Sequence, residues 1–410
     1  MNLLLQLSSI KAQSALTISG SKSETNRLLL LKALYPNLSL ENSSNSDDAM
    51  AMKEALSNTN TIIDIHHAGT AMRFLTAYFA IQENQEIVLT GSSRMKERPI
   101  KILVDALNHL GAKITYQEKE GFPPIRIKGV KLNLNRVTLP ANISSQYSTA
   151  LMLIASSLEQ GLEIQLEGTI TSLPYIKMTL ALLQTIGIEA TFNENKININ
   201  NLKSDSIKQT VVVESDWSSA SYFYSLIALS EMDTEITLSS YKKNSLQGDA
   251  VLVSIFKKLG IETTFGNHTI TIKKTAEPIE SHLVLNLNDA PDIAQTIAVC
   301  CFGMRMSCHL TGLQTLKIKE TDRLNALQIE LTKLGATIEV TEDSLRLSSS
   351  TNILSNISIS TYQDHRMAMA FAPLSLKVPI VIKQSEVVSK SYPAFWEDLK
   401  QIGIQIEEIL

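Results

Sequence analysis

Residues 87–112 read IVLTGSSRMKERPIKILVDALNHLGA. The stretch contains, in order, an apolar run typical of a strand, a polar loop with three bases, and a helix that ends at Leu110-Gly111. Glycine after the last helical turn is the expected left-handed cap. The stretch therefore predicts a strand–loop–helix unit for which further copies can be sought.

Four later helices end in the same way, at Gly187, Gly260, Gly335 and Gly403. Starting from Gly111, the glycines are 76, 73, 75 and 68 residues apart. Near-constant spacing over most of a chain indicates internal duplication. A weaker first copy starts at Leu38, with its helix expected over residues 47–56, so the sequence predicts six related units.

Each unit also contains a second helix that is more apolar. These helices are expected to start near Ser23, Gly69, Ser144, Asp216, Asp292 and Asp364. Helices that are apolar nearly all round are buried helices. Strands that alternate with two helices, one of them buried, predict an α/β fold in which layers of sheet and helix surround parallel buried helices.

A chain of 410 residues is expected to form two domains, and six units divide as three plus three. We place the divide near Val213–Glu214. The early strand, residues 3–7, precedes the first unit and is assigned to the second half. The expected domains are therefore residues 14–213, and residues 1–13 together with 214–410, with two crossings of the chain between them.

Composition limits the possible classes of function. The sequence is 44% hydrophobic and 19% charged, which supports aliphatic cores and excludes a disordered chain. The net charge of −4 argues against a general nucleic-acid binder, so any anion site must be a local group of bases.

The cysteines and the apolar segments indicate a cytoplasmic protein without a membrane span. Cys300, Cys301 and Cys308 fit neither a disulfide framework nor CxxC metal spacing, and buried reduced thiols are expected. No segment approaches the ~20 apolar residues that span a bilayer. Residues 1–10 lack the basic region of a signal peptide.

Polar residues gather where the buried helices begin. The first such helix follows Gly20 and carries Lys22, Ser23 and Arg27 in its first turns. A helix N-terminus presents unpaired N–H groups and a positive dipole end, which suits anions. Such a stretch alone also fits an ordinary capped surface helix. Parallel packing would bring three N-termini together in each domain, a site for a ligand with two anionic groups.

The loops before the outer helices add bases and acids. Residues 94–98 hold three bases, residues 317–323 alternate base and acid, and Lys390 adds one more base. Guanidinium and ammonium groups recognise phosphate and carboxylate. A carboxylate such as Glu320 or Asp292 among these bases could act as a general acid or base. Each run alone also fits a solvated charged loop, but recurrence at one position of the repeat favours function.

The motifs together resemble one family closely, from about residue 20 to residue 390. They are Gly20-Ser21-Lys22-Ser23 with Asn26-Arg27, Ala68-Gly69-Thr70-Ala71-Met72-Arg73, Arg94-Met95-Lys96-Glu97-Arg98-Pro99, Ser144-Ser145-Gln146, Pro291-Asp292, Lys319-Glu320-Thr321-Asp322-Arg323 and Asp364-His365-Arg366-Met367-Ala368-Met369. The chain resembles the 5-enolpyruvylshikimate-3-phosphate synthases, a family of enolpyruvyl transferases. The resemblance implies a two-domain inside-out α/β barrel, with three βαβαββ repeats in each domain.

The resemblance also implies the reaction and the site. An enolpyruvyl group would pass from phosphoenolpyruvate to the 5-hydroxyl of shikimate 3-phosphate, without a metal or cofactor, in a monomer. Shikimate 3-phosphate would be bound by Lys22, Ser23, Arg27, Ser144, Ser145, Gln146, Ser172, Tyr175, Asp292 and Lys319. Phosphoenolpyruvate would be bound by Lys22, Gly69, Arg98, Gln146, Arg323, Arg366 and Lys390. Asp292 and Glu320 would transfer protons, assisted by Lys22.

The sequence departs from the family pattern at several positions. His67, Phe74 and Thr315 stand where Asn, Pro and Asn are usual, and residues 53–66 form a shorter segment than usual. These changes affect fine binding geometry and remove none of the charged groups. His66 and His67 are adjacent, but two imidazoles without partner spacing are weak evidence for a metal site.

Two other functions remain open at this level. The related transferase acting on UDP-N-acetylglucosamine normally carries a reactive cysteine in its first half, whereas all three cysteines here lie in the second half. A non-catalytic repeat scaffold that binds a phosphorylated ligand or an oligonucleotide could share the fold. Such a scaffold would not need Asp292 and Glu320 beside a basic cluster.

Overall fold

The computed structural model describes residues 1–409 except 59, 141–143, 169, 171 and 204–206. The chain divides into two compact units, which are Gly20–Val213 (the first unit) and Met1–Ser19 with Glu214–Leu410 (the second unit). The first unit starts at Gly20 and not at residue 14. The reason is that β2 (Gln13–Leu16) pairs in parallel with β13 (Glu235–Ser239), which ties residues 14–19 to the second unit.

The first unit contains six helices, a short 3-10 helix and ten strands among its described residues. The helices are α1 (Lys22–Leu34), α2 (Asp47–Ser57), α3 (Gly69–Ala80), η1 (Met95–Glu97), α4 (Lys101–His109), α5 (Ser145–Ala155) and α6 (Leu173–Thr185). The strands are β3 (Leu38–Glu41), β4 (Ile62–Asp64), β5 (Glu86–Thr90), β6 (Lys113–Tyr116), β7 (Ile125–Lys128), β8 (Arg136–Pro140), β9 (Leu162–Glu167), β10 (Ala190–Asn193), β11 (Lys196–Ile199) and β12 (Gln209–Val212).

The second unit repeats this alternation of strands and helices. Its helices are α7 (Trp217–Leu229), η3 (Gly248–Val251), α8 (Leu252–Lys257), η4 (Pro291–Ile293), α9 (Ala294–Gly303), η5 (Gln314–Ile318), α10 (Arg323–Lys333), α11 (His365–Phe371), η6 (Ala372–Leu376), η7 (Ser385–Lys390) and α12 (Phe395–Ile402). Its remaining strands are β1 (Asn2–Leu5), β14 (Ile261–Phe265), β15 (Thr269–Lys274), β16 (His282–Asn286), β17 (Ser307–Thr311), β18 (Ile338–Val340), β19 (Ser344–Leu347), β20 (Ile357–Ile359), β21 (Ile380–Ile382) and β22 (Ile406–Ile409).

The repeat predicted from the glycine spacing is present in the sheets. In one copy, β16 and β17 run parallel on either side of α9 in the chain, and β17 then pairs antiparallel with β19, which pairs with β18. The sheets β4-β5-β7-β6, β8-β9-β11-β10, β2-β13-β15-β14 and β20-β21-β1-β22 have the same order. The α/β class is therefore confirmed.

One repeat is shorter than expected. It contains only the parallel pair β3 and β12, with α1 and α2. Four residues separate the end of α2 at Ser57 from the start of β4 at Ile62, too few for two further strands. The expectation of six full βαβαββ repeats is wrong here. Across the described residues the strands form six separate sheets and close no barrel.

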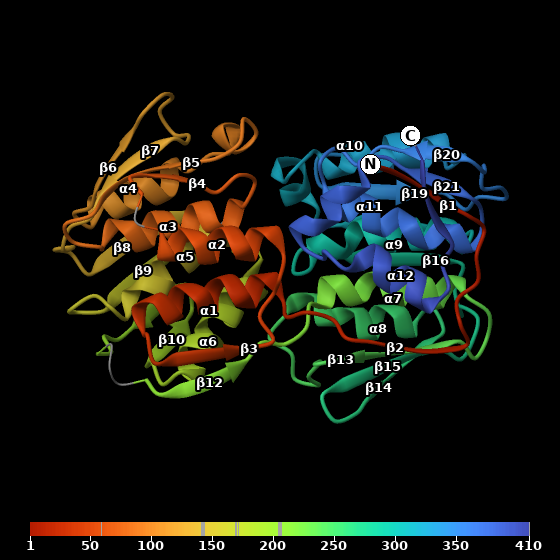
Figure 1. Ribbon diagram of the computed structural model, residues 1–410, viewed down its shortest axis with the longest axis horizontal. Helices are drawn as coiled ribbons and strands as arrows, with labels where there is room; N and C mark the ends of the chain where they lie inside the picture. The colour runs from red at the N-terminus through yellow and green to blue at the C-terminus, as the bar shows by residue number, and fades with distance from the viewer. Residues whose placement is uncertain (59, 141–143, 169, 171, 204–206, 410) are drawn as a thin grey trace. The chain divides into compact units, whose positions relative to one another are not determined.

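The N-terminal strand completes the last repeat. Strand β1 lies between β21 and β22 and pairs antiparallel with both, with Leu3 opposite Ile382 and Leu5 opposite Ile406. This pairing confirms that the first strand of the chain belongs with the second half. Figure 1 shows the red N-terminal strand beside the blue C-terminal ones.

The chain passes between the units at the same place in the repeat both times. Strand β2 leads into α1, and β12 leads into α7, so each passage occurs between the first strand and its buried helix. A unit therefore takes its strand and the following helix from segments far apart in the sequence.

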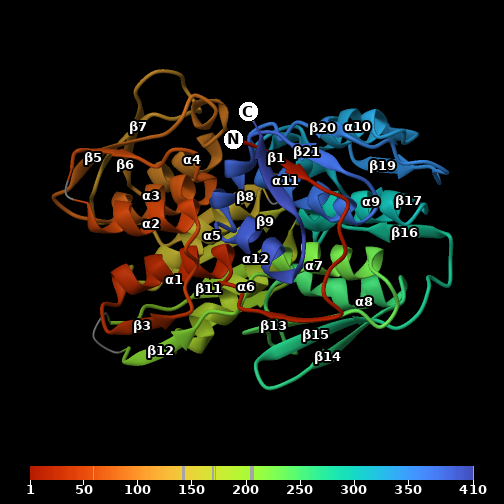
Figure 2. The same ribbon diagram turned by 45° about the vertical axis from the view of Figure 1, so that its right-hand side comes forward.

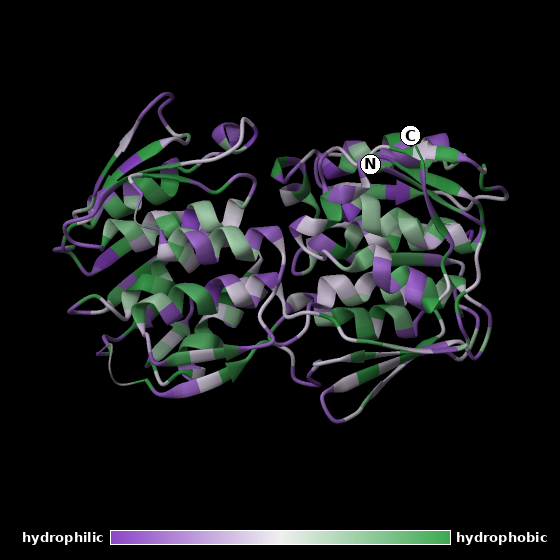
Figure 3. Ribbon diagram, viewed as in Figure 1, coloured by the Kyte–Doolittle hydropathy of each residue, from purple (hydrophilic) through white to green (hydrophobic). Residues whose placement is uncertain are grey.

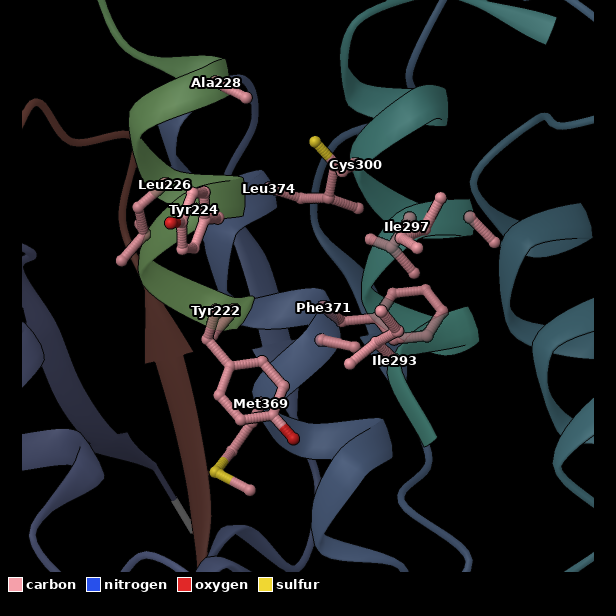
Figure 4. Close-up of a cluster of buried hydrophobic side chains, with 14 of the residues drawn as sticks. Tyr222, Tyr224, Leu226, Ala228, Ile293, Ile297, Cys300, Met369, Phe371 and Leu374 are labelled. Atoms are coloured by element: carbon pink, nitrogen blue, oxygen red, sulfur yellow. The ribbon is translucent and has the colours of Figure 1, made fainter. Parts of the chain in front are cut away.

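Buried helices form the core of each unit. In the second unit α7, α9 and α11 contact one another, and all ten residues of α9 are buried. Figure 4 shows Ile297 of α9 beside Phe371 of α11. Helices α1, α3 and α5 are in mutual contact in the first unit. In Figures 1 and 2 the sheets lie outside these helices, which carry extensive hydrophobic colour in Figure 3.

The cysteines belong to this apolar interior. Cys300, Cys301 and Cys308 are free and buried, as predicted. Burial raises the pKa of the Cys300 thiol to about 12, so this group stays protonated at neutral pH. In the described part of the chain, no helix is long and apolar enough to cross a membrane.

The pairing of β1 predicts a difference between two neighbouring leucines. Leu5 is fully buried, whereas Leu7 is 57% exposed. Leu5→Ala should lower the free energy of unfolding by about 2–5 kcal/mol, because it leaves a cavity in the last repeat. Leu7→Ala should change it by less than about 0.5 kcal/mol. Urea unfolding measures both, and equal effects would contradict the placement of β1.

Candidate functional site

Arg323 lies at the centre of a charged cluster in the second unit. It is the first residue of α10, a helix capped by Asp322, whose carboxylate accepts from the backbone N–H of Asn325 at 3.1 Å. The guanidinium of Arg323 donates to three carboxylates. They are Asp364 (Nε to Oδ2, 2.7 Å), Asp292 (Nη1 to Oδ1, 2.8 Å) and Glu320 (Nη2 to Oε2, 2.8 Å).

Burial separates these carboxylates into two kinds. The Asp364 side chain is fully buried, whereas those of Asp292 and Glu320 are 13% and 20% exposed. Asp364 also accepts from the backbone N–H of Arg366 and so caps α11. Burial would lower the pKa of Arg323, but the surrounding carboxylates raise its pKa above the usual value. Arg323 is therefore a permanent cation that holds two partly accessible carboxylates.

A second guanidinium, that of Arg366, joins the starts of three buried segments. Its Nη1 donates to the backbone oxygen of Asp292 at 3.1 Å. Its Nη2 lies 3.3 Å from Asp292 Oδ2 and 3.2 Å from the Ser218 hydroxyl on α7. The beginnings of α7, η4 and α11 thus meet, as predicted for parallel buried helices. Lys319 adds another base, with its ammonium 3.5 Å from Asp292 Oδ1.

Lys390 lies at the edge of this cluster. Its ammonium donates to the backbone oxygen of Gln363 at 2.7 Å, one residue before Asp364. Tyr362 and Gln363 both have positive φ angles, 54° and 57°. This turn directs the Gln363 carbonyl to Lys390, which ends η7.

In the first unit, Arg27 forms the corresponding buried cation on α1. Its guanidinium donates to the Thr179 hydroxyl at 2.8 Å and to the backbone oxygens of Ser23 at 2.7 Å and Tyr175 at 3.5 Å. It also lies 5.5 Å from the ring centre of Phe74 and 5.8 Å from that of Tyr175. Burial lowers the pKa of Arg27 to about 10, which still leaves it charged at neutral pH.

The starts of α3 and α5 form another group of predicted residues. Gln146 donates its side-chain amide to the Thr70 hydroxyl at 3.3 Å, which joins the two helix ends. Arg98 lies against Gly69, where a Cβ atom would stand 2.2 Å from Nη1 of Arg98. Only glycine allows this approach of the guanidinium to the start of α3.

The remaining predicted residues lie around these groups. Lys22 pairs with Asp48 of α2, with 3.1 Å between Nζ and Oδ2. Ser144 caps α5 by accepting from the backbone N–H of Gln146, and Ser145 follows it as the first helical residue. Ser172, before α6, has a left-handed φ of 56°, and its carbonyl accepts from the N–H of Tyr175.

The three departures from the family pattern have distinct surroundings. Phe74 is fully buried beneath the Arg27 guanidinium, so the aromatic ring supports a cation. His67 shares a hydrogen bond of 2.9 Å between Nδ1 and the Ser92 hydroxyl. The Thr315 hydroxyl is buried and has no hydrogen-bond partner within the described residues.

Sequence reasoning missed three carboxylates. Asp364 is predicted only as a helix start and as part of its motif, and Asp48 and Asp249 are not singled out. Asp249 lies in η3, before the outer helix α8, which is the repeat position that also holds residues 94–98 and 317–323. The recurrence of charge at that position was a usable signal for Asp249.

The charged groups of each unit suit the binding of anions. Arg27, Arg98, Arg323 and Arg366 provide guanidinium forks for phosphate or carboxylate groups. In the second unit, Asp292 and Glu320 both contact Arg323, so two partly accessible carboxylates are held close to one another, and carboxylates are able to transfer protons.

The comparisons with known proteins agree with this chemistry. A model of the EPSP synthase (3-phosphoshikimate 1-carboxyvinyltransferase) family matches residues 40–399. This chain belongs to that family. The 3-phosphoshikimate 1-carboxyvinyltransferase of Bacteroides fragilis is 42% identical over 99% of this chain and 98% of its own length. That of Haemophilus influenzae is 34% identical over 96% and 97%.

Solved structures share the fold. An EPSP synthase from Acinetobacter baumannii superposes with a TM-score of 0.81 at 21% identity, over 99% of both chains. An enolpyruvyl transferase from Streptomyces tendae gives 0.72 at 13% identity, over 99% of this chain and 98% of that one. The resemblance found in the motifs is thereby confirmed, and the chain is a transferase of this family.

The Arg323–Asp364 pair leads to a prediction about stability. Asp364→Asn leaves the buried guanidinium with less compensation and should lower the free energy of unfolding by about 3–5 kcal/mol. Glu339→Gln, an exposed position on β18, should change it by less than about 0.5 kcal/mol. Urea unfolding of both variants provides the measurement. A loss below about 1 kcal/mol for Asp364→Asn would show that the pair does not stabilise the fold.

Proposed function

We propose that this protein transfers the enolpyruvyl group of phosphoenolpyruvate to the 5-hydroxyl of shikimate 3-phosphate and releases phosphate. The single observation that carries the proposal is the Arg323 cluster, in a chain 42% identical to a 3-phosphoshikimate 1-carboxyvinyltransferase. The cluster places two carboxylates among bases, which is what an acid–base reaction of two polyanions requires.

The proposed reaction is an addition followed by an elimination. The 5-hydroxyl oxygen bonds to C2 of phosphoenolpyruvate and loses its proton, while C3 gains a proton and becomes a methyl group. The resulting tetrahedral intermediate then loses a proton from that methyl group, and the C–O bond to phosphate breaks. The vinyl group re-forms on the new ether, and no electrons are exchanged with an oxidant or reductant.

Asp292 and Glu320 are the proposed proton-transfer residues. Both accept hydrogen bonds from Arg323, and both side chains are partly exposed. One carboxylate removes the hydroxyl proton. The other begins as a carboxylic acid, delivers its proton to C3, and as a carboxylate later takes a proton from the methyl group. Lys22 assists by neutralising charge on the departing phosphate. The fixed cation keeps both carboxylates oriented throughout the cycle.

The acceptor, shikimate 3-phosphate, is assigned mainly to residues of the first unit. A guanidinium has five N–H donors, and Arg27 uses three in the contacts with Thr179, Ser23 and Tyr175. The full proposed set is Lys22, Ser23, Arg27, Ser144, Ser145, Gln146, Ser172, Tyr175, Asp292 and Lys319.

The donor, phosphoenolpyruvate, carries a phosphate and a carboxylate. The close approach of Arg98 to Gly69 combines a guanidinium with the start of α3, a favourable place for an anion. Arg366 provides a second fork beside Asp292. The full proposed set is Lys22, Gly69, Arg98, Gln146, Arg323, Arg366 and Lys390.

Further proposals concern the setting of the enzyme. We expect a monomer in the cytoplasm that needs no cofactor, because the reaction consists of proton transfers and carbon–oxygen bond changes. We expect no nucleic acid or membrane as a partner. The alternative acceptor UDP-N-acetylglucosamine is disfavoured because the three cysteines all lie buried in the second unit.

Phosphate release tests the proposal directly. The purified protein is mixed with phosphoenolpyruvate and either shikimate 3-phosphate, UDP-N-acetylglucosamine or no acceptor. Release only with shikimate 3-phosphate is the expected result. Release with UDP-N-acetylglucosamine, or none with either acceptor, would overturn the proposed function.

Glu320→Gln should fold normally and bind shikimate 3-phosphate but lose turnover. The amide preserves shape and cannot exchange a proton, so kcat should fall by about 100-fold or more. Steady-state kinetics and calorimetric binding measure the two properties. Glu339→Gln is the matched control and should keep full turnover; full turnover in Glu320→Gln would remove the assigned role.

Lys22→Met should chiefly weaken the use of phosphoenolpyruvate. Loss of an ammonium that neutralises the donor phosphate should reduce kcat/KM for phosphoenolpyruvate on the order of 10-fold or more. Lys32→Met, at an exposed position of the same helix, is the control and should behave as the wild type. Unchanged kinetics in Lys22→Met would contradict the anion site at the start of α1.

A further inference from the structure

Asp249 is a buried carboxylate that the proposed mechanism does not use. It lies in η3 and is only 6% exposed. Its Oδ2 makes a short hydrogen bond with the hydroxyl of Ser218, in the first turn of α7. A buried carboxylate is costly unless a partner holds it, so the contact with Ser218 is informative.

The direction of this hydrogen bond follows from the groups around Ser218. Nη2 of Arg366 lies 3.2 Å from the same hydroxyl oxygen, and a guanidinium can only donate. The serine oxygen therefore accepts from Arg366, and its single proton points to Asp249. The carboxylate thus orients the hydroxyl so that its lone pair faces the guanidinium.

The chain of contacts continues into the proposed site. Arg366 also donates to the backbone oxygen and the carboxylate of Asp292. Asp249, Ser218, Arg366 and Asp292 therefore form one connected line of hydrogen bonds. Removing either of the first two members would therefore remove or weaken the support that Arg366 receives from the Ser218 hydroxyl.

We propose that Asp249 is a positioning residue, which acts through the Ser218 hydroxyl to hold the Arg366 guanidinium in place for the anionic donor substrate. The inference rests on the proposed function, because it assigns a task to a residue of that site. It makes Asp249 a determinant of phosphoenolpyruvate binding without contact with the substrate.

The charges around Asp249 add a dependence on pH. The pKa of Asp249 is raised to about 6. Burial is the largest cause of the rise, Arg366 opposes it, Asp292 adds to it, the hydrogen bond from Ser218 opposes it, and Asp216 adds to it. An anion bound at Arg366 adds negative charge nearby, so binding should raise the pKa of Asp249 further. Binding then takes up a proton, and the affinity for the anion falls as pH rises through about 6.

The experiment compares Asp249→Ala, Ser218→Ala, the double variant and Asp249→Asn in the full chain. Asp249→Ala and Ser218→Ala should each raise KM for phosphoenolpyruvate on the order of 10-fold, with a smaller change in kcat. The double variant should be no worse than either single variant, because both remove the same support. Asp249→Asn retains an acceptor oxygen and should restore KM at pH 7.

A pH series separates orientation from charge. Between pH 5.5 and 8, KM for phosphoenolpyruvate should rise more steeply in the wild type than in Asp249→Asn, which cannot titrate. Titration of phosphoenolpyruvate itself is common to both proteins and drops out of the comparison. Glu262→Ala, at an exposed position of β14, is the control and should match the wild type.

The outcomes distinguish this inference from the proposed function. If the wild type releases no phosphate, the proposed function fails. If the wild type is active but Asp249→Asn keeps the full pH slope, or the two alanine effects multiply in the double variant, the positioning role fails. Circular dichroism and urea unfolding identify any alanine variant that does not fold, and the Asp249→Asn comparison then decides.

Discussion

The buried guanidinium of Arg323 is the interaction on which the charged cluster of the second unit depends. It contacts Asp364 at 2.7 Å and Asp292 and Glu320 at 2.8 Å each. A cation whose side chain is 2% exposed needs carboxylates around it, and the cation in turn stabilises negative charge on these neighbouring carboxyl groups. Fully buried Asp364 accepts a hydrogen bond from Nε of Arg323 and fixes the guanidinium. Asp292 and Glu320 can therefore stay partly accessible while Arg323 holds them in place.

The repeated architecture explains how these residues meet. In each repeat the first strand runs towards the start of a buried helix, and the loop after the second strand leads to an outer helix. Packing the buried helices against one another gathers their starting residues, which include Asp292, Ser218 and Arg366. The outer-helix loops add Lys319, Glu320, Arg323 and Asp249. Duplication of one repeat therefore brings together charged residues that would lie in a solvated loop if only a single repeat were present.

Much of this was predictable from the sequence, for physical reasons. Glycine caps gave the period of the repeat, and apolar helices gave the buried layer, because both follow from local backbone and burial rules. Residues 14–19 were assigned to the first unit because the pairing of β2 with β13 is a long-range contact without a local signal. The absence of two strands from the short repeat was suggested only by the short segment over residues 53–66. The sequence could not show that Asp249 and Ser218 support Arg366. Ser218 and Asp249 are 31 residues apart in the chain and belong to no shared motif, so only the side-chain geometry shows their contact.

We propose that the carboxylates held by Arg323 add a proton to the donor's methylene carbon and later remove one from the resulting methyl group. Proton transfer at that carbon is directly visible in D₂O, where mass spectrometry or NMR follows the vinyl group. Deuterium is expected in the vinyl group of the product, because the methyl group of the intermediate rotates and can lose either a protium or the added deuterium. A product whose vinyl group contains only protium while phosphate is released would contradict proton transfer at that carbon.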